Sequence, residues 1–161
     1  MKNLLIVITI STLFSCSNTD EMDEQYFNLY AGLEFSIFND QNEDLLNPGN
    51  PNHLNTDDIR LFYVINGESQ EFYKGSLDNP RGYSIDENEG IYRIGIFLNY
   101  SETEDKPITY IQWNNNIETD TIEVSYRRSQ HSIIQETIWL NGEQIWEIGD
   151  NTTDPYFMLE K

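Results

Sequence analysis

The chain has 161 residues, of which 28 are Asp or Glu and only 9 are Lys or Arg, and its formal net charge is -19 at pH 7. Binding to nucleic acid or adsorption to an anionic lipid surface needs a basic face, which so few cations cannot supply. The single cysteine excludes a disulfide framework and a cysteine-rich zinc module. With 38% hydrophobic and 13% aromatic residues the chain can bury a core, and its length favours one domain.

A short apolar segment, LLIVITISTL at 4–13, follows Lys2 near the N-terminus and leads into Leu13-Phe14-Ser15-Cys16. Because a helix needs roughly 20 apolar residues to span a bilayer, this segment is typical of a cleavable signal peptide. The only cysteine directly follows a small residue. The arrangement resembles the lipobox of bacterial lipoproteins, which has a leucine, a small residue before the cut and a cysteine after it. Phe14 departs from the small residue usual at the second lipobox position.

The resemblance implies that residues 1–15 are removed and that Cys16 becomes an acylated N-terminal residue, which anchors the chain to a membrane through its lipid. The alternatives are an ordinary signal peptide with a chance cysteine and a buried apolar helix. Residues 16–25 are polar and acidic, so we expect a flexible tether. The tether also resembles the acidic export signal that sends lipoproteins of the Bacteroidota to the outer face of the outer membrane, although a plain solvated linker has the same composition.

From Tyr26 onward the apolar residues mostly alternate with polar ones, which is the pattern of half-buried strands. Alternation or a continuous apolar run predicts strands at 33–37, 59–65, 92–100, 108–113 and 121–127. No long segment in this part of the chain has helical periodicity. We therefore expect residues 26–161 to form one all-β domain, an antiparallel β-sandwich of about eight strands and immunoglobulin-like size.

Two Asn-Gly dipeptides lie between apolar runs, at Asn66-Gly67 and Asn141-Gly142. Both residues tolerate the positive φ of a type I′ turn, so each dipeptide predicts a hairpin. A two-residue turn at 141–142 pairs Ile138 with Ile145. This register puts Trp139 and Trp146 together on the opposite face, where they could dock a partner.

The longest connection, 39–58, is rich in Asn, Asp, Pro and Gly. Three of its residues have the alternating oxygen-ligand spacing with which calcium loops begin: Asp40, Asn42 and Asp44. Leu45 and Pro51 occupy the glycine and glutamate positions of an EF-hand, which excludes that motif. The open alternatives are a calcium site of another kind and an Asx-rich turn. We expect Leu45 and Leu46 to tuck under the loop against the core.

Aromatic and cationic side chains provide further candidates. Sugars stack on flat aromatic faces beside amide partners, so three tryptophans are candidate ligand-binding residues: Trp113, Trp139 and Trp146. The alternative is that these side chains fill the core of the sandwich. The chain has few cations, so we expect four arginines to pair with carboxylates: Arg60, Arg93, Arg127 and Arg128.

Catalytic motifs are absent from the sequence. His53 and His131 have no metal-ligand spacing, and neither GxSxG nor a glycine-rich phosphate loop occurs. These observations argue against an enzyme. Asp120-Thr121-Ile122 is similar to the short sequon at which Bacteroidota O-glycosylate exported proteins, so Thr121 is a candidate for glycosylation if its hydroxyl escapes burial.

Taken together, Cys16, the acidic tether and a sandwich that opens with LEFSIFNDQNEDLLNP resemble the small lipoproteins of the Bacteroidota. The resemblance implies a location and a fold class, and it transfers no functional residues. The leading hypothesis is a non-catalytic binding or accessory module at the cell surface that contacts a glycan, a protein or a host ligand. The alternatives are a periplasm-facing subunit or inhibitor that docks through Trp139 and Trp146, and then an enzyme.

Overall fold

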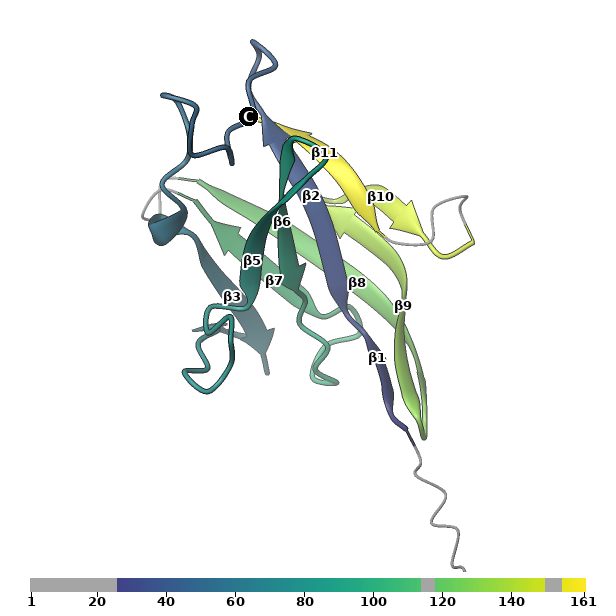
Figure 1. Ribbon diagram of the computed structural model, residues 1–161. Coiled ribbons are helices and arrows are strands. Elements are labelled where there is room, and N and C mark those ends of the chain that lie inside the picture. Colours follow the sequence, from purple (N-terminus) through teal and green to yellow (C-terminus); the bar gives the residue numbers. More distant parts are fainter. Residues whose placement is uncertain (1–25, 114–117, 150–154) are drawn as a thin grey trace, which may run out of the picture.

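The computed structural model describes residues 26–113, 118–149 and 155–161. These residues contain eleven strands, one 3₁₀ turn (Thr56–Asp58) and no α-helix, and the strands form two packed sheets (Figure 1). The predicted all-β sandwich is confirmed. The signal peptide, Cys16 and the tether lie outside the described residues. Within the described part of the chain, no helix has the length and apolarity to cross a membrane.

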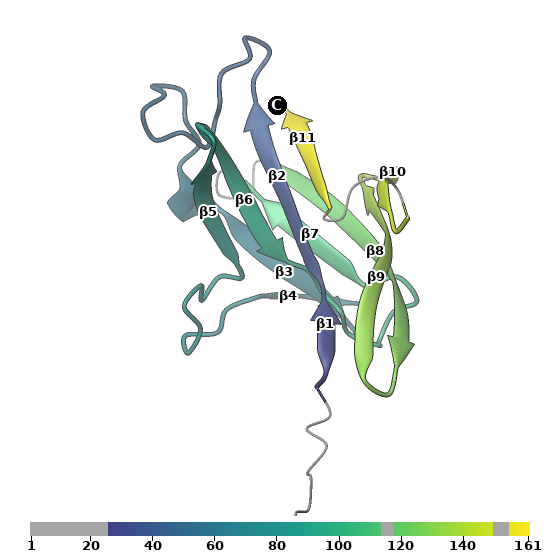
Figure 2. The same ribbon diagram turned by 45° about the vertical axis from the view of Figure 1, so that its right-hand side comes forward.

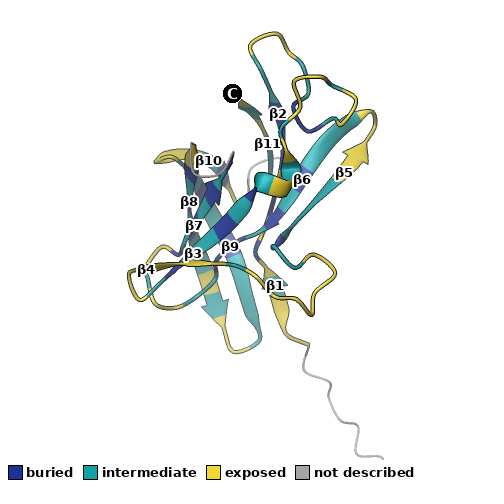
Figure 3. Cartoon of the chain, turned by 90° about the vertical axis from the view of Figure 1, so that its left-hand side faces the viewer, coloured by how far each residue is buried: buried dark blue, intermediate teal, exposed yellow. Residues whose placement is uncertain are grey.

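The first sheet has the order β1-β9-β8-β7-β3-β4, and β10 also pairs with β9. Its strands are β1 (Asn28–Tyr30), β3 (Arg60–Ile65), β4 (Glu68–Glu71), β7 (Ile108–Gln112), β8 (Thr119–Ser129), β9 (Ser132–Leu140) and β10 (Glu143–Glu147). The second sheet has the order β11-β2-β6-β5. Its strands are β2 (Gly32–Phe38), β5 (Tyr83–Asn88), β6 (Ile91–Phe97) and β11 (Tyr156–Glu160). Figure 3 views the two layers from the side.

The sheets are mixed, whereas the sequence pattern predicted antiparallel pairing. Strand β1 runs parallel to β9, and β11 runs parallel to β2. The chain passes from β1 in one sheet to β2 in the other through the single residue Ala31 (Figure 2). Strand β1 can therefore cover an edge of the first sheet before the chain joins the second.

The predicted inward-facing residues of the long strands form the core. Leu33, Phe35 and Ile37 of β2 are buried against the corresponding apolar residues of β6 and β8. Removing each such side chain from water contributes about 1.5–3 kcal/mol. Leu45 and Leu46 belong to the same cluster, which confirms that these two leucines of the 39–58 loop pack against the core.

Both predicted Asn-Gly turns are present. Asn66 and Gly67 have φ of 52° and 77°, and Asn141 and Gly142 have φ of 51° and 85°. A third turn of the same kind joins β5 to β6 at Glu89-Gly90, with φ of 54° and 85°. The sequence pattern does not predict a hairpin at this turn, because glutamate rarely adopts positive φ.

The predicted register of the last hairpin is wrong beyond its first two pairs. Gln144 lies opposite Trp139 as expected, but the register then shifts, and Trp146 rather than Ile145 lies opposite Ile138. A single extra residue in a strand exchanges its inward and outward faces. Trp146 therefore joins Ile138 in the core cluster, and the expected common face of Trp139 and Trp146 does not exist.

Candidate ligand-binding cleft

The cleft lies at the edge of the sandwich where the chain changes sheets. Strand β1 pairs with residues 132–134 of β9, and β10 pairs with residues 137–140, so the two strands flank residues 135–136 on the same edge. A cavity of about 470 Å³ opens here between β2 and β6 on one side and β9 and β10 on the other. Its apolar lining includes Leu33, Ile96, Ile134, Trp146, Ile148 and Pro155.

Two buried polar atoms in this lining have no hydrogen-bond partner. Gln135, which is 5% exposed, donates from Nε2 to the carbonyl oxygen of Gly32 at 2.9 Å, but its Oε1 accepts nothing. Trp146 is 8% exposed, and its Nε1–H has no acceptor. Each unsatisfied buried group costs about 1–3 kcal/mol. The lining of the cleft thus includes one residue with an unused neutral acceptor and one with an unused neutral donor.

The two side chains are unusual among the buried polar groups. Four buried side-chain atoms lack a hydrogen-bond partner in the described residues, and two of them belong to Arg93 and Arg128. Both arginines form ion pairs, with Glu34 and Glu102 respectively. The remaining two atoms belong to Gln135 and Trp146, and both of these residues line one cleft.

Two local irregularities turn these side chains inward. Two consecutive residues of β8, Ser125 and Tyr126, pair with Thr137 and Gln135 of β9. Glu136, between those two partners, is therefore an extra residue in β9. In β10, Ile145 is the extra residue. If side chains alternated regularly inward and outward from the buried Ile138, then Gln135 and Trp146 would both face away from the core. The chemistry of Trp146 makes it a candidate from the sequence alone, whereas Gln135 is not predictable, because no residue in SIIQETIWL marks the irregularity.

The mouth of the cleft is partly aromatic and carries one paired charge. Tyr30 is 61% exposed and Ile148 is also exposed. Glu34 is the only charged residue in the described lining, and its carboxylate lies 3.7 Å from Nη1 of Arg93. The Arg93 guanidinium in turn lies 4.3 Å from the ring centre of Tyr156. The charge at the rim is therefore locally balanced.

A second hollow of about 560 Å³ lies between the segment after β4 and strands β5 and β6, and includes Phe72, Leu77 and Tyr83. No buried side-chain atom among the described residues of its lining lacks a partner. The edge cleft is therefore the stronger candidate for a site.

Trp113 has a structural environment. It is 0% exposed, and its Nε1 donates to Oδ2 of Asp120 at 2.8 Å. Lys161 Nζ lies 2.8 Å from the same oxygen, and Asn141 Nδ2 donates to Oδ1 at 2.9 Å. Burial opposes ionisation of Asp120, but the hydrogen bonds from Lys161, Asn141 and Trp113 outweigh it and hold the pKa of this carboxyl below its usual range. Trp113 presents no face to a ligand, and the asparagines that follow it lie outside the described residues.

Trp139 lies on the opposite face of the first sheet from the core. The Nζ atom of Lys106 lies 3.8 Å from the centre of its ring, and its cross-strand neighbours are Glu123 and Gln144. The three candidate tryptophans therefore occupy three separate environments, and only Trp146 lines the cleft.

The predicted calcium residues belong to a loop that is held by its own side chains. Asp44 accepts from the backbone N–H of Leu46 through Oδ1 and from that of Tyr92 through Oδ2, both at 2.9 Å. Asp40 and Asn42 are exposed in the adjacent turn. No group of three His, Cys, Asp or Glu in the described ranges is arranged to hold a metal ion. An Asx-turn is present at Asp44, and calcium binding stays a prediction.

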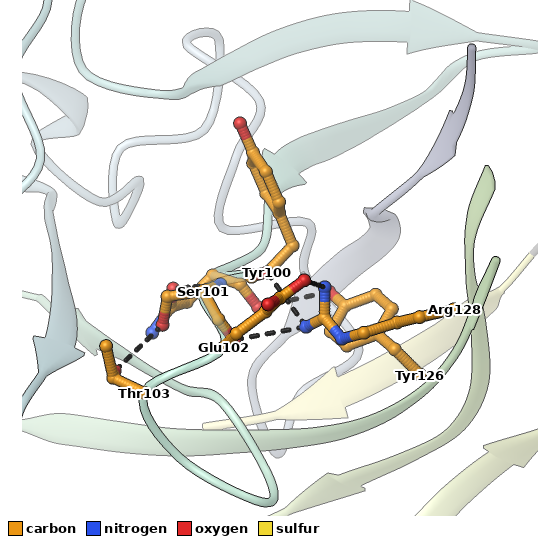
Figure 4. A network of polar contacts seen from close by, with 7 residues as sticks. Tyr100, Ser101, Glu102, Thr103, Tyr126 and Arg128 are labelled. Atoms are coloured by element: carbon orange, nitrogen blue, oxygen red, sulfur yellow. Dashed lines mark hydrogen bonds and ion pairs between the residues drawn. The ribbon is translucent and has the colours of Figure 1, made fainter. Parts of the chain in front are cut away.

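The four arginines pair with carboxylates as expected: Arg60 with Glu71, Arg93 with Glu34, Arg127 with Glu136, and Arg128 with Glu102. Figure 4 shows Arg128, whose guanidinium lies beside the Glu102 carboxylate and the ring of Tyr126. Its Nη2 also donates to the carbonyl oxygens of Tyr100 and Ser101, at 2.9 and 3.0 Å. Arg128 lies on β8 and thereby links this strand to the segment that follows β6.

The remaining candidates lie apart from the cleft. His53 is exposed in the 39–58 loop, and its Nδ1 lies 2.7 Å from the carbonyl oxygen of Asn50. His131 is in the turn between β8 and β9. Thr121 is half-buried on β8, opposite Tyr110 of β7, and its glycosylation stays a prediction.

Comparison with models of protein families, with curated proteins and with solved structures gives no match to this chain. The cleft and the N-terminal sequence are therefore the two features from which we infer a function.

Proposed function

We propose that this chain is a lipid-anchored protein of the bacterial envelope that is displayed on the outer face of the outer membrane and binds a ligand without transforming it. The lipobox-like sequence at Cys16 supports the anchor, and the acidic residues after it support export to the surface. The net charge of -19 repels an anionic envelope and favours a domain that projects from it.

The single observation that carries the binding role is the edge cleft. It combines apolar walls with a neutral donor and a neutral acceptor that find no partner within the described residues. Ligand pockets typically have this composition, with predominantly apolar walls and a few placed polar groups. A ligand that formed a hydrogen bond with each atom would remove the cost of leaving that atom buried and unsatisfied, and this gain favours binding.

The position of β1, with which the described part of the chain begins, is compatible with surface display. Strand β1 begins beside the turn between β8 and β9, where the backbone N–H of Asn28 donates to the carbonyl oxygen of His131 at 2.9 Å. The 39–58 loop and the C-terminus lie at the other end of the sandwich (Figure 1). An anchor at Cys16 would hold the first end near the membrane and leave the second end projecting.

Protease shaving of intact cells tests the location. We expect the wild-type protein to be degraded while a periplasmic control survives, and we expect the Cys16→Ala variant to lose acylation and membrane association. Protection of the wild type until the outer membrane is broken would place it in the periplasm and overturn surface display. A periplasmic partner could not use Trp139 and Trp146 as one docking surface, because the two side chains lie on opposite faces of their hairpin.

A further inference from the structure

We propose that the edge cleft binds the acetamido group of an N-acetylated sugar, with the amide N–H donating to Oε1 of Gln135 and the amide oxygen accepting from Nε1 of Trp146. The proposal rests on the binding role given above and names the ligand class. A secondary amide carries one donor, its N–H, and one acceptor, its carbonyl oxygen, which point in opposite directions in the trans form, so the acetamido group would lie between the two side chains. It therefore supplies one partner for each of the two unsatisfied atoms.

The walls of the cleft distinguish an acetamido group from a simple hydroxyl. A hydroxyl could also donate to Gln135 and accept from Trp146, but it would bring no apolar surface. The acetamido methyl can pack against Leu33, Ile96 and Ile148, all of which line the cleft. Burying a methyl-sized group in an apolar environment contributes roughly a further three- to fourfold in affinity.

The charges around the cleft favour a neutral ligand. An anion would meet the carboxylate of Glu34 at the rim and the net charge of -19 of the whole chain. A cation would find that this carboxylate already pairs with Arg93. The two atoms without a hydrogen-bond partner belong to the uncharged side chains of Gln135 and Trp146. A neutral amide can bond to both without burying a charge.

The surroundings of the cleft favour a sugar over a peptide as the source of the amide. A peptide usually binds to such an edge by adding a strand, but β1 and β10 already occupy the adjoining parts of β9. The exposed ring of Tyr30 at the mouth offers a flat apolar surface on which the face of a pyranose can stack.

Gln135 can present its oxygen without losing its present contact. One hydrogen bond, from Nε2 to the carbonyl oxygen of Gly32, holds its side-chain amide. The terminal torsion of glutamine has a broad energy minimum, so the planar amide can rotate slightly as a unit, which moves Oε1 toward the cleft within the range that still permits the hydrogen bond from Nε2 to Gly32. The hydrogen bond to Gly32 therefore orients the side chain for the ligand.

Calorimetric titration of the full-length protein in mild detergent tests the proposal with matched sugars. We expect the β-1,4-linked disaccharide of N-acetylglucosamine to bind at least tenfold more tightly than cellobiose, which has the same linkage and no amide. Equal binding of the two, or binding of neither, would overturn the proposal. Equally tight binding of N-acetylalanine methylamide would assign the site to peptide amides and would also overturn it.

Two apolar variants locate the binding. Trp146→Phe removes the indole N–H together with part of the ring, and Gln135→Met removes the side-chain oxygen together with the hydrogen bond to Gly32. We expect each variant to weaken binding of the acetamido disaccharide by about tenfold. Trp139→Phe is the matched control, because its ring lies on the other face of the same hairpin, and it should bind like the wild type. Melting curves of all three variants distinguish lost binding from lost folding.

Unchanged binding by folded Trp146→Phe and Gln135→Met proteins would overturn the proposal. The location of the protein is determined separately by protease shaving. A protein that is exposed on cells but shows no preference for the amide would retain the proposed location and lose the proposed ligand.

Discussion

Two buried tryptophans of this sandwich have opposite polar environments. The indole N–H of Trp113 meets the carboxylate of Asp120, which also accepts from Lys161 and Asn141. The indole N–H of Trp146 meets no acceptor, although its residue is almost as well buried. One tryptophan therefore completes a satisfied network, and the other retains an unused donor.

The difference separates a residue that stabilises the fold from one that is available to a ligand. A buried donor with a charged acceptor contributes to folding, because its hydrogen bond to water is replaced by a stronger one. A buried donor without an acceptor lowers stability until something outside the chain supplies one. Trp113 directly follows β7 and Trp146 lies in β10, and both side chains belong to the core cluster, so burial alone does not separate the two roles and the environment of the indole nitrogen does.

Removal of the Asp120 carboxylate should have the largest effect on stability. Asp120→Ala leaves the Trp113 N–H, the Lys161 ammonium and the Asn141 amide without their shared acceptor, and breaking a buried charge network in this way costs about 3–5 kcal/mol. Urea denaturation measures the loss. Glu118→Gln is the control, because the Glu118 side chain is more exposed and pairs with Lys161, while the backbone carbonyl oxygen of Glu118, which accepts from the backbone N–H of Trp113, is unchanged by the substitution. Losses of equal size would contradict the central role of Asp120.

Equivalent substitutions at the two tryptophans test the comparison directly. Trp113→Phe loses ring volume and leaves Asp120 without one donor, so we expect a loss of about 2–3 kcal/mol. Trp146→Phe also loses volume but removes an unsatisfied donor, so the two effects oppose each other and the net change should stay within about 1 kcal/mol. Chemical denaturation of both variants at neutral pH measures the difference. Equal losses would show that the indole nitrogen of Trp146 finds a partner in solution.

The Asp120 network should also make stability depend on pH. The pKa of Asp120 is lowered in the folded state, so the stabilisation is fully present above the pKa of an unfolded aspartate, about 3.9, and is lost as the pH falls through the folded value. We expect the difference in melting temperature between wild type and Asp120→Asn to be constant from pH 7 to about 5. It should shrink as the pH falls further. A difference that persists at the lowest pH at which both proteins fold would contradict the assignment.

The sequence predicts this fold well wherever its signals are local. Alternation in β2 identifies Leu33, Phe35 and Ile37 as core residues, and the positive φ that Asn and Gly tolerate identifies two hairpins. The excess of carboxylates predicts the ion pairs of the arginines. Each of these predictions depends on residues close together in the chain or on its overall charge composition. Both kinds of information are contained in the sequence.

The site could not be predicted because it depends on two one-residue irregularities and on non-local pairing. The extra residues Glu136 and Ile145 turn Gln135 and Trp146 into the cleft, and neither has the glycine that often marks such an irregularity. The parallel pairing of β1 with β9 and of β11 with β2 joins segments far apart in the chain. Local patterns contain no information on either feature.

Addition of calcium should have the smallest effect on thermal stability, because the Asp44 carboxylate, unlike the Trp146 N–H, is already satisfied. Both carboxylate oxygens of Asp44 already accept backbone N–H groups, so a cation would have to replace those hydrogen bonds rather than fill an unused position. We therefore expect the melting temperature to agree within about 1 °C in millimolar calcium and in chelator, which corresponds to a small fraction of 1 kcal/mol. A rise of several degrees with calcium that Asp40→Asn abolishes would instead establish a site at Asp40, Asn42 and Asp44. Such a result would show that the Asx-rich loop exchanges its own hydrogen bonds for metal coordination.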